Sequence, residues 1–174
     1  MRATNSSVTS VAGVSFVAAV ILGAAPTLGC GEPELSSERT DRQVSVAEAG
    51  ATVMPFDLEK TTHVFETTES GGLQQVVSDS DDAEQVKLIR EHLSEEAERF
   101  ARGDFHDPEM IHGEDMAGLH QLVGGHERIS IEYSEIDRGA QILYTTEDPE
   151  LVVAIHAWFS VQLRDHGDHA QPDR

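Results

Sequence analysis

The sequence predicts an α+β domain: a four-stranded antiparallel sheet with two long helices on one face and a short linking helix. The segment from Thr61 onward repeats itself with an offset of 66 residues, so that Gln75-Val-Val-Ser corresponds to Gln141-Ile-Leu-Tyr. Each copy starts with two strand-forming segments around a turn and ends with apolar residues at helical spacing. Two such ββα units can bury their apolar faces together when their four strands form one sheet and both helices pack on the same face of it.

Each copy opens with a predicted hairpin. In the first copy, segments 63–66 and 73–78 flank the turn Ser70-Gly71-Gly72. In the second, segments 129–133 and 140–144 flank Asp137-Arg138-Gly139. Glycine, serine and aspartate are typical of tight turns. Because hairpin strands run antiparallel, the four strands are predicted to form one antiparallel sheet.

A long helix is predicted to follow each hairpin. Negative charge suits a helix N-terminus, and Asp81-Asp82 and Glu147-Asp148 stand where the helices should begin, with Pro149 in the first turn of the second. Between the copies we expect a loop over 103–113 and a short helix over 114–123. Apolar residues then define one buried face per long helix: Val86, Ile89, Leu93, Ala97 and Phe100 in the first, and Val152, Ile155, Phe159 and Leu163, followed by His166, in the second.

The first 29 residues are typical of an export signal rather than of a folded segment. Arg2 gives a positive start, and the apolar run over 11–25 is short for a membrane span but suits a signal peptide. Gly29 precedes the only cysteine, Cys30, as in a bacterial lipobox. We therefore expect lipidation of Cys30 and anchoring to the bacterial cell envelope, on the periplasmic side or the cell surface. The alternatives are an uncleaved anchor, or an ordinary signal peptide with an incidental cysteine.

The rest of the chain divides into a tether and one domain. Residues 30–55 form the tether, which starts at the lipidated cysteine and includes a short helix over 41–49. Residues 56–170 form a single α+β domain, and residues 171–174 form a tail. A domain of this length can bury one hydrophobic core.

Charge and missing motifs exclude several function classes. The formal net charge is −20, from 32 acidic and 12 basic residues, so the surface repels nucleic-acid phosphates and attracts cations. The chain contains no G-x-S-x-G, P-loop or G-x-G-x-x-G motif. We therefore expect no nucleic-acid partner, and no motif assigns an enzyme class.

Nine histidines are the strongest chemical signal in the sequence. The repeat matches His63 to Ile129 and His166 to Phe100, so two imidazoles occupy positions where an apolar residue is expected. Imidazole with thioether suits copper, and imidazole with carboxylate suits zinc. The leading hypothesis is therefore a transition-metal site, copper first and zinc second. Its candidate ligands are His63, His112, Met116, His156 and His166.

Other readings of the same residues stay open. Met116 can instead pack in the core, and His156 can lie on a helix face with its polar edge exposed. One alternative function is a non-catalytic binding module of the cell envelope that uses the surface around Trp158. A second is a small enzyme with a histidine–carboxylate dyad, such as His63–Asp165 or His112–Asp115.

Several short strings resemble a group of small bacterial proteins of no established activity. They are Met54-Pro-Phe-Asp57, Thr61-Thr-His-Val-Phe65, Ile111-His-Gly-Glu-Asp-Met116, His156-Ala-Trp-Phe159 and Asp165-His-Gly167. Some members of that group carry the label aspartate carbamoyltransferase. This chain lacks that enzyme's S-T-R-T loop and H-P-x-Q segment and is too short for its two domains. The resemblance therefore implies neither that activity nor any site residue.

Overall fold

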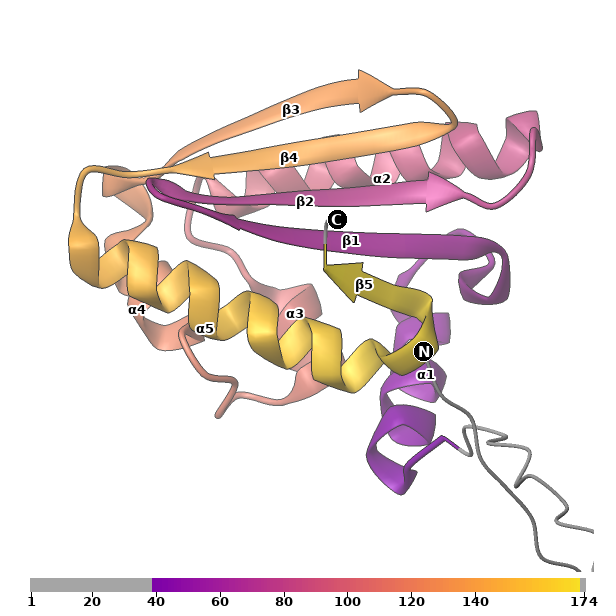
Figure 1. Cartoon of the computed structure of the whole chain (residues 1–174), viewed down its shortest axis with the longest axis horizontal. Coiled ribbons are helices and arrows are strands. Elements are labelled where there is room, and N and C mark those ends of the chain that lie inside the picture. Colours follow the sequence, from indigo (N-terminus) through magenta and orange to yellow (C-terminus); the bar gives the residue numbers. More distant parts are fainter. Residues whose placement is uncertain (1–38, 173–174) are drawn as a thin grey trace, which may run out of the picture. The chain divides into compact units, whose positions relative to one another are not determined.

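The two predicted hairpins form the centre of the sheet. In the computed structural model, which describes residues 39–172, β1 (Thr61–Thr68) pairs antiparallel with β2 (Gly71–Ser78). β3 (Ser130–Ile136) pairs antiparallel with β4 (Gly139–Thr145), and β4 also pairs antiparallel with β2. The strand order is β3-β4-β2-β1-β5 (Figure 1). The predicted antiparallel four-stranded arrangement is thus present within a larger sheet.

A fifth strand makes that sheet mixed, which corrects the prediction of four antiparallel strands. β5 (Ala170–Pro172) pairs in parallel with β1, and His63 is opposite Ala170. The turn η3 (Gly167–His169) leads the chain into this strand. Part of the predicted tail therefore extends the sheet at the β1 edge.

The two long helices begin and end one repeat length apart. α2 spans Ala83–Phe100 and α5 spans Pro149–His166, which is an offset of 66 residues at both ends. The carboxylates of Asp82 and Asp148 cap these helices by accepting hydrogen bonds from backbone N–H groups in the first turn. The prediction of two long helices that begin after acidic residues is confirmed.

The two ββα units are arranged symmetrically about one residue pair. Gln75 is opposite Gln141, and its Nε2 donates to the Gln141 Oε1 at 2.9 Å. On either side of this pair, Gln74 is opposite Ile142 and Val76 is opposite Ala140. This register is what a local two-fold rotation between the units requires. α2 packs mainly on β3 and β4 and α5 on β1 and β2, so each helix covers the hairpin of the other unit.

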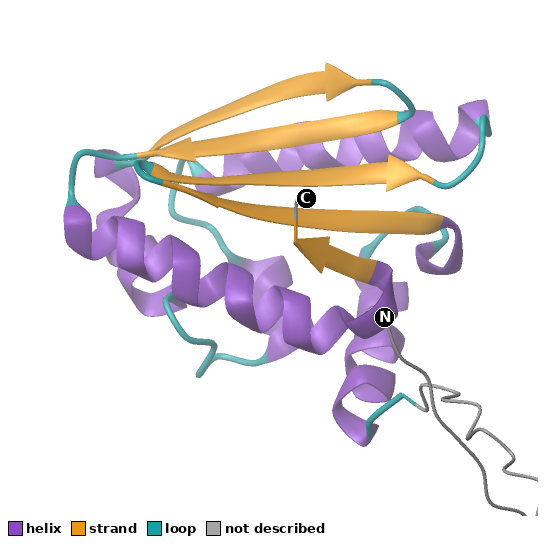
Figure 2. Cartoon of the chain, in the orientation of Figure 1, coloured by secondary structure: helices purple, strands orange, loops and turns teal. Residues whose placement is uncertain are grey.

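The segments outside the repeat differ most from the prediction. The expected loop over 103–113 contains α3 (His106–His112), and the linking helix α4 (Leu119–Gly125) begins later than expected. α1 (Asp41–Val53) packs against α3 and α5, so the folded domain extends N-terminal to the expected start at Phe56. The 3-10 turns η1 (Leu58–Lys60) and η2 (His126–Arg128) precede β1 and β3. Figure 2 shows these helices beside the sheet.

Trp158 lies at the centre of the core between the sheet and the helices. Its side chain is fully buried and makes edge-to-face contacts with Phe100, Phe105 and Tyr144, at ring-centroid distances of 6.0, 5.9 and 5.5 Å. Trp158 is therefore a core residue and does not itself contribute to the molecular surface. Among residues 39–172, no helix is long and apolar enough to cross a membrane.

Candidate functional site

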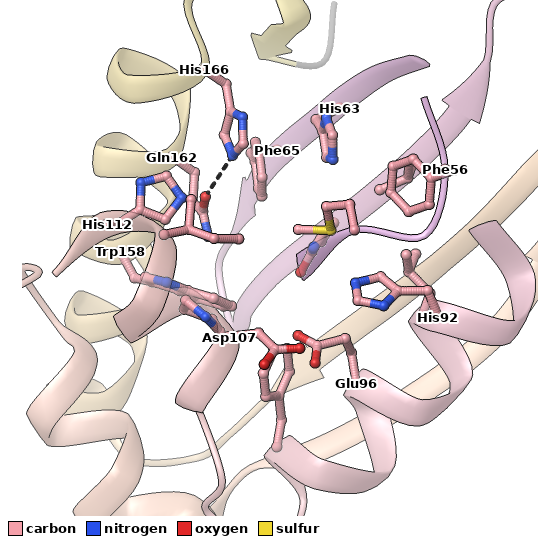
Figure 3. A pocket seen from close by; sticks show the side chains of 17 residues that line it. Phe56, His63, Phe65, His92, Glu96, Asp107, His112, Trp158, Gln162 and His166 are labelled. Atoms are coloured by element: carbon pink, nitrogen blue, oxygen red, sulfur yellow. Dashed lines mark hydrogen bonds between the residues drawn. The ribbon is translucent and has the colours of Figure 1, made fainter. Parts of the chain in front are cut away.

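A small cavity lies between the helix-bearing face of the sheet and α2, α3 and α5 (Figure 3). Its volume is about 30 Å³, which is room for one or two water molecules. Its apolar walls include the rings of Phe56, Phe65, Phe100 and Trp158. Polar side chains interrupt these walls at two places. Figure 3 shows His63, His112 and His166 toward one side of the cavity, and Glu96 and Asp107, with His92 beside them, toward the other.

The first polar group is an imidazole cluster formed by His63, His112 and His166. The rings of His63 and His166 stack at a centroid distance of 4.9 Å and an interplanar angle of 16°. The ring of His112 meets His166 edge-on at 5.1 Å. The side chain of Gln162 is close to His166, with 3.1 Å between His166 Nε2 and Gln162 Oε1. Three of the five predicted ligands are thus brought together from β1, α3 and α5.

The buried carboxylate of Asp165 contacts His112, one member of this cluster. Its Oδ2 is 3.0 Å from the His112 Nδ1 and accepts hydrogen bonds from Arg42 at 2.6 and 3.1 Å. Arg164 Nε donates to its other oxygen at 3.1 Å. Burial favours a neutral carboxyl, but the hydrogen bonds from Arg42 and His112 outweigh this and hold the pKa of Asp165 below its usual value. The structure therefore contains a histidine–carboxylate pair, His112–Asp165, in place of the expected His63–Asp165 and His112–Asp115.

His63 presents an unsatisfied polar atom. The residue is only 3 % exposed, and its Nδ1 is buried without a hydrogen-bond partner among the described residues. Burial lowers the pKa of His63 to about 4, so the ring is neutral at physiological pH. The Trp158 Nε1 is likewise buried and unpaired in the described part of the chain. An unpaired buried polar group costs about 1–3 kcal/mol, so two at one cavity require an explanation.

The second polar group is a carboxyl pair, Glu96 and Asp107. Both side chains bind the same nitrogen of Arg99: Nη1 is 3.1 Å from Glu96 Oε1 and 2.7 Å from Asp107 Oδ2. Burial, together with the nearby charge of Asp107, raises the pKa of Glu96 to about 8. The hydrogen bonds from Arg99 and Glu96 outweigh burial and lower the pKa of Asp107. At neutral pH the pair therefore holds one proton, on Glu96.

Two predicted ligands lie elsewhere. Met116 is buried in the hydrophobic core, as its alternative reading expected. His156 Nε2 is 3.0 and 2.9 Å from the carbonyl oxygens of Thr68 and Gly71, at the turn between β1 and β2. Ten residues of helix separate His156 from His166, which is about 15 Å along α5. His156 therefore ties the helix to a hairpin turn and cannot join the imidazole cluster.

The geometry gives the metal hypothesis little support. Among residues 39–172, no group of three or more histidine, cysteine, aspartate and glutamate side chains is arranged to hold a metal ion. A metal lies in the plane of each imidazole that binds it, and two stacked, nearly parallel rings such as His63 and His166 do not share such a point. Copper or zinc binding stays a prediction that would need these rings to turn.

Sequence reasoning missed the carboxyl pair, and it named Asp165 only as a partner of His63 and not of His112. The repeat could have revealed part of the site. The residues that α2 and α5 contribute to the cavity wall are spaced four apart on each helix, and the two sets are related by the 66-residue offset. The equivalent pairs are His92 and Trp158, Glu96 and Gln162, and Phe100 and His166. Each pair consists of two lining residues, so the two helices contribute equivalent positions to the cavity wall.

Comparison of the chain with family models, curated proteins and solved structures gives no match. Its function is therefore inferred from the geometry of this cavity.

Proposed function

We propose that this domain binds a small polar molecule in the cavity between the sheet and α2, α3 and α5. The observation that carries the proposal is the pair of unpaired buried nitrogens, His63 Nδ1 and Trp158 Nε1, at one aromatic-lined cavity. A bound molecule that offers a donor to the imidazole and an acceptor to the indole removes both unsatisfied groups. Binding sites typically combine such apolar walls with a few polar groups and perturbed pKa values.

The single tryptophan makes the proposal directly testable. The indole N–H resonance of Trp158 can be followed by NMR while methanol or formamide, small molecules that carry both a donor and an acceptor, is added. We expect at least one probe to shift this resonance saturably. His63→Leu should weaken that binding at least tenfold, because it removes a hydrogen-bonding partner and substitutes a side chain like the equivalent Ile129.

The matched control is His120→Leu, which changes an exposed histidine and should leave the affinity unchanged. An indole resonance that no probe moves would contradict the proposal. So would a crystal structure in which ordered water alone bridges the two nitrogens in the presence of saturating probe.

We also propose that the chain is an exported lipoprotein anchored to the cell envelope through Cys30, a residue that lies outside the described range. In a bacterial host fed a clickable palmitate analogue, the protein should carry the label and sediment with membranes. Cys30→Ser should remove both properties, whereas Thr27→Ser should retain them. Labelled, membrane-bound Cys30→Ser protein would exclude lipidation at this residue.

A further inference from the structure

We propose that the molecule bound here is hydrogen peroxide, and that it oxidises Met54, a residue that lines the same cavity, to the sulfoxide. This inference rests on the proposed function and assigns both its ligand and a modification site. Met54 follows the last residue of α1, where its backbone N–H donates to the Gly50 carbonyl. Its half-buried side chain packs against the hydrophobic core. Figure 3 shows a sulfur atom among the side chains drawn around the cavity, and Met54 supplies it.

The size and polarity of the cavity suit a molecule as small as peroxide. A volume of about 30 Å³ admits one or two oxygen atoms. Each oxygen of hydrogen peroxide carries one hydrogen and two lone pairs, so the molecule can donate to His63 Nδ1 and accept from Trp158 Nε1. Both nitrogens are buried and have no hydrogen-bond partner among residues 39–172. Water offers the same donors and acceptors, but it cannot oxidise a thioether.

The charges around the cavity favour an uncharged molecule. His63 is neutral at physiological pH, because burial lowers its pKa to about 4. The Glu96–Asp107 pair holds one proton, and Arg99 binds both of its side chains. These groups therefore leave no charge for an ion in the cavity to compensate, and an ion would lose its hydration without gaining a partner. Hydrogen peroxide is uncharged at neutral pH and avoids this cost.

The thioether of Met54 supplies the chemistry. Peroxide converts a methionine thioether to the sulfoxide, which is the reversible product of methionine oxidation. The sulfur attacks one peroxide oxygen, the O–O bond breaks and an S–O bond forms. The proton of the transferred oxygen ends on the departing oxygen, which leaves as water. The sulfur loses two electrons and the peroxide gains two, so no other reactant is needed. Because the peroxide is bound before it reacts, the rate should saturate as its concentration rises.

The test follows sulfoxide formation at each methionine of the full chain by peptide mass spectrometry while the peroxide concentration is raised. We expect the rate at Met54 to saturate, with half-saturation no lower than about 6 mM, because a ligand of two non-hydrogen atoms binds weakly. Met110 is the internal control, since its side chain is 58 % exposed. Its rate should rise in proportion to peroxide and, at low concentration, be about tenfold slower than at Met54. Methanol, which competes for the cavity, should slow oxidation at Met54 but not at Met110.

A variant links the oxidation to the bound peroxide. His63→Leu should remove the saturation at Met54 and lower its rate about tenfold, whereas His120→Leu, at an exposed position, should react as the wild type does. Competition by methanol uses the wild-type chain, so that result does not depend on the folding of a variant.

The outcomes separate this inference from the proposed function. A rate at Met54 that rises linearly with peroxide, or that stays below the rate at Met110, would overturn the inference. The proposed function would survive that result if methanol still shifts the Trp158 resonance saturably. Failure of every probe to move that resonance would overturn both.

Discussion

Asp165→Asn is expected to lower the free energy of unfolding by about 3 kcal/mol. The carboxylate is fully buried and accepts hydrogen bonds from Arg42, Arg164 and His112 at once. Removal of one partner from such a buried network costs about 3–5 kcal/mol, because the remaining groups lose their compensating charge. The lower end applies because Arg42 is half exposed and can be rehydrated. Urea unfolding of wild type and variant measures the difference.

Asp137→Asn serves as the matched control for this experiment. Asp137 is 97 % exposed, so its replacement should change the unfolding free energy by less than about 0.5 kcal/mol. A loss below about 1 kcal/mol for Asp165→Asn would mean that the network contributes little to stability. In that case α1, which reaches the network through Arg42, would not be held to the cavity by this contact.

The dependence of stability on pH should carry two opposite contributions from the cavity. The pKa of His63 is about 4 in the folded chain and 6.5 when exposed, so only the unfolded chain takes up the proton between these values. Stability is therefore lost as the pH falls from 6.5 to 4, by about 3 kcal/mol. The pKa of Glu96 is raised to about 8 from 4.5, so the unfolded chain releases its proton first as the pH rises. Stability is then lost between pH 4.5 and 8, by about 5 kcal/mol.

Unfolding free energies measured from pH 4 to 8 separate the two contributions. His63→Leu should reduce the loss of unfolding free energy as the pH falls from 6.5 to 4. Glu96→Gln should reduce the loss of unfolding free energy as the pH rises from 4.5 to 8. Glu95→Gln, at an exposed position, should follow the wild type throughout. A Glu96→Gln profile parallel to the wild type over pH 5–8 would show that Glu96 is ionised in the folded protein.

Local signals were sufficient to predict the repeated part of the fold. Asp82 and Asp148 cap helices as their position before an apolar stripe indicated, and both hairpins form. β5 could not be predicted because three residues are too few for a strand period to be recognised. The loop predicted over 103–113 contains α3, whose Pro108 lies in the first turn of the helix, where a proline costs no backbone hydrogen bond.

The candidate site was predictable only where an unusual residue replaced an apolar one. His63 and His166 were found because their repeat partners are Ile129 and Phe100. Glu96 gave no such signal, since the chain has 32 acidic residues and nothing in a single sequence separates a buried one from the rest. Its side chain is buried beside Asp107 of α3, and no local sequence pattern encodes this contact between two helices.

The crossed packing of the two helices makes the two ββα units depend on each other. In this arrangement the helix of a single ββα unit does not cover the hairpin of its own unit. Two separate copies could cover their hairpins only by packing each helix on the other copy, as in a homodimer. Such a homodimer must place identical residues at both equivalent wall positions. Within one chain the two equivalent positions can differ. Glu96 on α2 and Gln162 on α5 line the same cavity, so a carboxyl group on one helix wall is matched by an amide on the other.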